Sequence, residues 1–232
     1  MGLQRLLIPF VVLALSVPAG AGDRAPRSLA VGTTQQPRSS VPTPSRANIG
    51  SQVARFNQAY TRLYRLSASS KHARYRTQLL SFLSQARQLE QYAQTDYERA
   101  LAKSSSDALT PCVELAMVAD AVSKVSVVFD GPANPSHSQL AKDIHTWLPR
   151  IDVTLKQDRD VLQFRDRNSG RVLPGSGDLN DPKVLYSEAV DRVKLAHTQL
   201  AAGEELGAWL SVAHSAMLVG NLAVRLSPPL SN

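Results

Sequence analysis

The side chains that could carry catalysis or hold a metal do not fall at the spacings that either chemistry needs. The sequence contains no His-x-x-x-His or His-Glu-x-x-His pair, which would bring two ligands onto one helical face. It also contains no Gly-x-Ser-x-Gly elbow, no phosphate-cradling glycine loop and no Cys-x-x-Cys pair. We therefore predict no catalytic residue, no metal site and no cofactor. The five histidines are His72, His137, His145, His197 and His214.

Carboxylates and histidines do not converge either. Asp158 and Asp160 are two residues apart, which places them on opposite sides of a helix. His145 and His197 lack an aspartate three or four residues away, so we expect both to be solvated surface histidines. The pattern favours a binding protein over an enzyme, and an enzyme of unrecognised chemistry is the weaker alternative.

The chain opens with an apolar run behind Arg5 that closes on Ala19-Gly20-Ala21, the spacing at which a signal peptidase cuts. The run is shorter than the ~20 residues that a membrane-spanning helix needs, and it contains two prolines. Residues 1–21 are therefore predicted to be a cleaved secretory signal peptide. We expect a secreted, extracellular protein, in the apoplast of a plant or the periplasm of a bacterium, with no stable membrane anchor.

Positive charge is concentrated early in the chain. From Arg24 to Arg87 there are eleven Lys or Arg and no Asp or Glu, whereas residues 90–232 carry fourteen basic and eighteen acidic residues. Residues 22–48 have too little apolar surface to repay the entropy of ordering, so we predict a disordered basic linker. The basic 24–87 segment could meet an acidic polysaccharide, an anionic lipid or the acidic remainder of the same chain, or its arginines could simply be solvated. Nucleic acid is disfavoured by the signal peptide.

Residues 49–232 carry apolar side chains at helical spacing and no alternating strand pattern of convincing length. We predict an all-α, up-and-down helical bundle with an N-terminal helical hairpin or arm. Pro149 should bend the fourth helix, the second could break near Gln91, and Asp181-Pro182 should cap the fifth. The stripes and punctuation predict helices near 49–63, 71–103, 109–129, 136–162, 182–200 and 206–224, with a long loop over 166–182.

Packing must hold this bundle together, because Cys112 is the single cysteine and cannot pair within its own chain. Cys112 lies on the apolar stripe of its helix and is expected to be a small buried hydrophobe. Trp147 and Trp209 are expected to anchor the core, with a sugar-stacking role as the alternative.

Four stretches resemble the plant invertase and pectin methylesterase inhibitor family. They are Ala108 to Leu115, where a cysteine precedes Glu-Leu, Thr146-Trp147-Leu148, Asp181-Pro182-Lys183-Val184, and Leu218 to Leu226 with its Asn221. The resemblance implies a secreted, non-enzymatic four-helix bundle with an N-terminal helical hairpin. The chain differs from the family in its cysteines, because family members carry four paired cysteines and this chain contains Cys112 alone.

The same resemblance implies where a partner would bind. Pro182-Lys183-Val184 is close to the Pro-Lys-Phe that invertase inhibitors present to the enzyme cleft, with Val184 in place of phenylalanine. The implied partner is a carbohydrate-active enzyme, with Lys183 reaching acidic cleft residues. The alternative is an extracytoplasmic small-ligand-binding or assembly factor with a cavity among its helices.

Overall fold

The computed structural model describes residues 46–103, 108–131, 137–169 and 178–227, and only the backbone of residues 46–48, 137–138 and 164–169. The chain divides into Met1–Val41 and a compact unit, Pro42–Asn232, which holds every helix described below. The predicted signal peptide, and the predicted linker as far as residue 45, lie outside the described residues.

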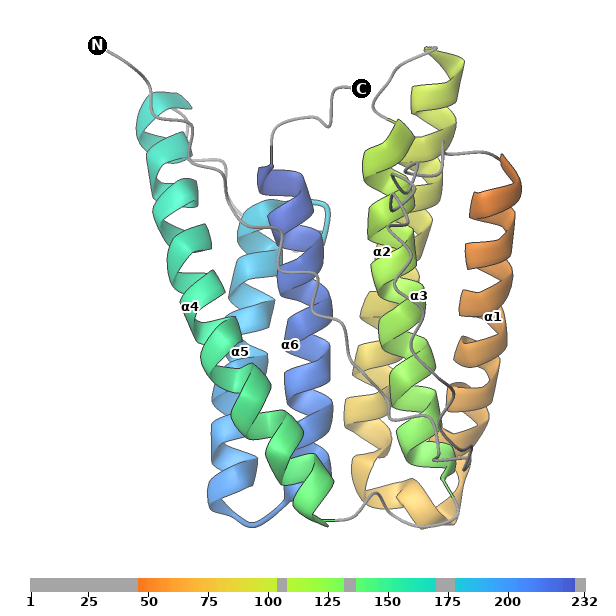
Figure 1. Ribbon diagram of the computed structural model, residues 1–232, viewed down its shortest axis with the longest axis vertical. Coiled ribbons are helices and arrows are strands. Elements are labelled where there is room, and N and C mark those ends of the chain that lie inside the picture. The colour runs from red at the N-terminus through yellow and green to blue at the C-terminus, as the bar shows by residue number, and fades with distance from the viewer. Residues whose placement is uncertain (1–45, 104–107, 132–136, 170–177, 228–232) are drawn as a thin grey trace, which may run out of the picture. The chain divides into compact units, whose positions relative to one another are not determined.

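Every regular element in the described residues is a helix, which confirms the all-α prediction (Figure 1). Successive helices run in opposite directions, so the topology is up-and-down. The elements are α1 (Arg46–Ala68), the 3-10 helix η1 (Ser70–Tyr75), α2 (Arg76–Ala102), α3 (Leu109–Asp130), α4 (His137–Ser169), α5 (Pro182–Ala201) and α6 (Glu205–Leu226).

The helices pack as two groups of three that meet along α3 and α6. In the first group, α1 and α2 both pack on α3, and in the second, α4 and α5 both pack on α6. The α5–α6 turn closes on Gly203, whose φ of 72° is a left-handed conformation that glycine adopts without steric cost. Contacts of α3 and α2 with α6 join the groups into one bundle.

The predicted N-terminal hairpin is built from α1 and α2 and belongs to the bundle. Phe56 and Leu63 of α1 are fully buried. The connection between the two helices is held at the end of α3, where Lys71 Nζ donates to the Gly131 carbonyl and the His72 ring lies edge-on to Phe129, with centroids 5.2 Å apart. Burial lowers the pKa of His72. These contacts fix the hairpin against α3.

Several helix boundaries differ from the prediction. Helix α2 continues through Gln91, so the predicted break is wrong, and it starts after the η1 turn, which Ser69 caps. Helix α4 continues to Ser169, past the predicted loop start, and includes Pro149. Figure 1 shows α4 changing direction part-way along its length, as expected for a helix that loses a backbone hydrogen bond at proline.

Helix α6 is the centre of the core. Its length and composition would allow it to cross a membrane. However, 83% of its most apolar 18-residue stretch is buried inside the bundle, as is typical of the core helix of a helical bundle. Trp147 and Trp209 are buried at 8% and 4% exposure, as predicted for core anchors. Cys112 is only half-buried, against a small cluster that includes Tyr97, and burial raises the pKa of its thiol.

Candidate functional site

The start of α5 carries the predicted partner-binding residues and is capped as the sequence predicts. The Asp181 carboxylate accepts a hydrogen bond from the Lys183 amide at 2.8 Å, and Pro182 occupies the first turn, where no helical N–H is lost. Side chains of Pro182, Lys183 and Val184 are all partly exposed, while Leu185 is fully buried. The cap therefore presents these three side chains at the surface on a helix end of defined conformation.

The turn before α5 is tied to helix α2. Asp178 Oδ1 accepts hydrogen bonds from the Asn180 amide at 2.9 Å and from the Tyr92 hydroxyl of α2. The hydrogen bond lowers the pKa of Asp178 and raises the pKa of Tyr92, because it favours the ionised carboxylate and the protonated phenol. Leu179 is 2% exposed and anchors the turn in the core. The Asp178 carboxylate is thus engaged in holding the turn.

Arg225 of α6 also holds this turn, through hydrogen bonds to Leu179 and Asn180. Its Nη1 donates to the Leu179 carbonyl at 3.1 Å and to Asn180 Oδ1 at 2.8 Å. Its Nε donates to Glu114 Oε1 of α3 at 3.0 Å, and the two side chains are only 10% and 4% exposed. Burial raises the pKa of Glu114, and the Arg225 guanidinium partly offsets that rise. The turn before α5 therefore contacts α2 through Tyr92 and α6 through Arg225, and Arg225 in turn pairs with Glu114 of α3.

A second polar cluster, partly buried between α2, α5 and α6, was missed by the sequence reasoning. Gln85 Nε2 donates to Glu188 Oε2 at 2.8 Å, so its Oε1 must be the acceptor that faces His214 Nε2 at 2.6 Å. His214 is fully buried, and its pKa lies well below the usual range because of burial and the nearby Arg192. A neutral imidazole closed off from solvent is a structural group rather than an acid or base for a substrate.

The polar cluster extends along α2 at helical spacing. Arg192 donates to Glu188 and to the Ser81 hydroxyl, and Gln78 Nε2 donates to Ser211 Oγ at 2.7 Å. Gln78, Ser81 and Gln85 lie three and four residues apart, so they form one polar face of α2 directed at α5 and α6. These side chains bridge α2 to the second group of helices.

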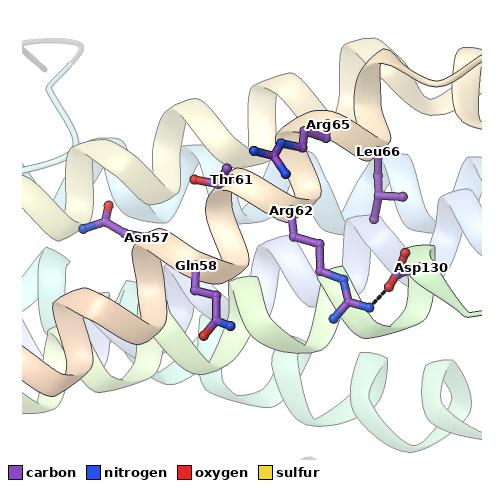
Figure 2. Close-up of a pocket in the computed structure, with 7 residues that line it drawn as sticks. All are labelled: Asn57, Gln58, Thr61, Arg62, Arg65, Leu66 and Asp130. Carbon is purple, nitrogen blue, oxygen red and sulfur yellow. Dashed lines mark ion pairs between the residues drawn. The ribbon is translucent and has the colours of Figure 1, made fainter.

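An open hollow runs along the outer face of α1, with a volume of about 740 Å³ (Figure 2). Among the described residues that line it, only Asp130 comes from a helix other than α1, and the hollow is open to solvent rather than enclosed. The lining residues are Asn57, Gln58, Thr61, Arg62, Arg65, Leu66 and Asp130.

The basic N-terminal segment meets acidic residues of the later helices. Arg55 contacts Asp120 of α3 at 3.2 Å, and Arg62 pairs with Asp130 at the end of the same helix. Arg74 pairs with Glu204 before α6. The described part of the basic segment therefore contacts acidic residues later in the same chain, which was one of the alternatives predicted from the sequence.

Among the residues the structure describes, no group of three or more His, Cys, Asp or Glu could hold a metal ion. His145 and His197 are exposed, as predicted, whereas His72 and His214 are buried. The anchors Tyr92, Glu114 and Arg225 were also missed. Glu114 lies three residues after Pro111 and four before Val118, on the buried face of α3. A charged residue on such a face indicates that a partner of opposite charge is buried beside it.

Comparison with known proteins finds no matching family model, no similar curated protein and no similar solved structure.

Proposed function

We propose that this chain is a secreted, non-enzymatic helical bundle that binds a protein partner through the start of α5, in the manner of the inhibitors of invertase or pectin methylesterase that it resembles. The observation that carries the proposal is the fixation of the α5 start from three helices at once. Tyr92 holds the preceding turn from α2, and Arg225 of α6 holds it while paired to Glu114 of α3. A surface held in its binding conformation loses little entropy when it docks.

The chemistry of this surface suits an acidic cleft. The helix dipole places partial positive charge at the first turn of α5, where the Asp181 carboxylate caps the Lys183 amide, and Lys183 adds an ammonium group there. Val184 is partly exposed beside it and offers an apolar contact. Carbohydrate-active enzymes that use carboxylates for catalysis have clefts of the matching charge, so the proposed partner belongs to this class.

Under this proposal, packing and buried polar contacts stabilise the bundle in place of the disulfides of the inhibitor family. The Glu114–Arg225 pair joins α3 to α6, and the Gln85–His214 contact joins α2 to α6. Both link the two groups of helices, so the surface at α5 would keep its conformation without a covalent link.

Titration of the purified chain into assays of pectin methylesterase and of invertase tests the proposal. We expect saturable inhibition of one of the two enzymes, weakened about tenfold or more by Lys183→Glu, since a repulsive charge in an acidic cleft costs more than a lost contact. Lys194→Glu is the matched control, because Lys194 lies on the same helix with its side chain 70% exposed. It should inhibit as the unchanged chain does.

Inhibition of neither enzyme, or equal loss of inhibition in the two lysine variants, would remove the α5 start as a docking surface. Thermal stabilisation of the chain by a small molecule, with no enzyme present, would favour the alternative of a ligand-binding bundle.

A further inference from the structure

The outer face of α1 carries two rows of hydrogen-bonding side chains and no acidic residue. Asn57, Thr61 and Arg65 follow one another at four-residue steps, and Gln58 and Arg62 form the neighbouring row (Figure 2). All five side chains are exposed. Along the open hollow two amides are therefore followed by a hydroxyl and then by two guanidinium groups.

An aromatic ring borders these rows. Tyr64 lies three residues after Thr61 and is 54% exposed. Its ring is parallel to that of Tyr60, with an interplanar angle of 5° and centroids 6.5 Å apart, and the Arg87 guanidinium covers Tyr60 at 4.3 Å. Because the stack fixes its orientation, Tyr64 offers a flat apolar surface to solvent beside the polar rows.

The arginines of this face can exchange their present partners for a ligand. The Arg62–Asp130 pair has side chains 57% and 31% exposed, and exposed pairs of this kind contribute little to stability. The Arg65 side chain is exposed and has no hydrogen bond or ion pair with the described part of the chain. The face therefore has guanidinium groups available for anions.

We infer that the outer face of α1 is a binding strip for a linear acidic polysaccharide. Arg62 and Arg65 pair with carboxylates of the polymer, since a guanidinium matches a carboxylate bidentately. Asn57, Gln58 and Thr61 bond the sugar hydroxyls, and Tyr64 stacks on the apolar face of a sugar ring. The hollow is open along the helix, which suits an extended polymer rather than an enclosed small molecule.

This inference does not depend on the proposed function. The strip lies on α1, which packs on α2 and α3, whereas the proposed docking surface lies on α5, which packs on α4 and α6. A chain that fails to inhibit any enzyme could still bind polysaccharide through α1, and the reverse also holds.

The test is calorimetric titration of the full chain with polygalacturonate, a linear polymer of carboxylate-bearing sugars, and with the fully methyl-esterified form of the same polymer. We expect binding of the acidic polymer that weakens with added salt, and at least tenfold weaker binding of the ester. Arg62→Gln/Arg65→Gln should lose about tenfold in affinity, and Tyr64→Ala about threefold or more. The matched control is Arg150→Gln/Arg159→Gln, which removes two exposed arginines from α4 and should change affinity less than twofold.

Equal binding of the acidic and esterified polymers would overturn the inference, as would equal losses in the two double variants, because net charge alone would then explain binding. A duplex DNA that binds as tightly as polygalacturonate and is unaffected by Tyr64→Ala would also overturn it, since the face would then recognise polyanions in general. Circular dichroism of every variant excludes misfolding as the cause of a loss.

Discussion

Glu114 of α3 and Arg225 of α6 form a buried ion pair, with Oε1 3.0 Å from Nε and side chains 4% and 10% exposed. The pair joins the two groups of helices, and the same guanidinium holds the turn that precedes α5. Stability of the bundle and presentation of the α5 surface therefore depend on one side chain.

Removing the arginine should destabilise the bundle strongly. Arg225→Met leaves the Glu114 carboxyl buried without its cation, so we expect a loss of about 3–5 kcal/mol in the free energy of unfolding. Glu114→Gln/Arg225→Met should recover part of that loss, because no buried charge remains uncompensated. Urea unfolding of the single and double variants measures both effects, and a change below about 0.5 kcal/mol in Arg225→Met would contradict this account of the pair.

Asp158 should make stability fall as pH rises. It lies on the packed face of α4 at 7% exposure, its Oδ2 has no hydrogen-bond partner in the described part of the chain, and burial raises its pKa from 3.8 to about 6. The folded state holds the proton more tightly than the unfolded state. The contribution of Asp158 is therefore most favourable below pH 4, declines between about pH 4 and pH 6, and is constant above.

Asp158→Asn removes that decline. We expect the variant to be more stable than the unchanged chain by about 1–3 kcal/mol at pH 7, and by much less at pH 4. Urea unfolding at pH 4, 5 and 7 checks the difference between the two proteins. Asp160→Asn is the matched control, because its side chain is 65% exposed, and it should show no such pH-dependent gain. A gain for Asp158→Asn that is the same at every pH would show that the effect is not titration.

Gly207 should not tolerate a side chain, because α5 and η1 approach it closely. A Cβ there would lie 2.6 Å from Gln199 Nε2 and 3.3 Å from a ring carbon of Tyr75. Gln199 is bonded to Gln78 and Ser211, so moving it breaks hydrogen bonds, and we expect Gly207→Ala to cost about 1–2 kcal/mol.

Gly50 provides the control for that substitution. A Cβ at Gly50 would meet no atom within 4 Å, and alanine favours helix over glycine by up to about 1 kcal/mol. Gly50→Ala should therefore be neutral or stabilising by thermal unfolding. Equal destabilisation of the two variants would argue against close packing at Gly207.

Removing the Asp181 cap should affect the start of α5 locally and leave the rest of the fold intact. Asp181→Ala removes the acceptor of the Lys183 amide, and we expect a loss of about 1 kcal/mol and faster hydrogen exchange in the first turn of α5. Ser69→Ala removes the cap of η1 instead and should leave exchange in α5 unchanged. If both variants accelerate exchange in α5 equally, the Asp181 contact does not hold this helix end.

Helices and caps were predictable from sequence because both depend on residues close together in the chain. The helices α2 and α3 and the Asp181-Pro182 start of α5 follow from local spacing, and the structure confirms them. The predicted break at Gln91 was wrong because Leu89 and Ala93 on either side are buried, and their packing keeps the helix continuous.

The polar contacts that position the candidate site were not predictable in the same way. Glu114 and Arg225 are 111 residues apart, and Gln85 and His214 are 129 apart, so each contact depends on how α6 lies against α2 and α3. Local periodicity predicts that such positions face the core. It does not predict which polar side chain they contact there.

The most direct test of partner binding through α5 is hydrogen exchange of the chain in complex with the enzyme that it is proposed to inhibit. We expect added protection in the first turn of α5, at the Lys183 and Val184 amides, with little change in α1. Protection that appears elsewhere and leaves the first turn of α5 unchanged would contradict it.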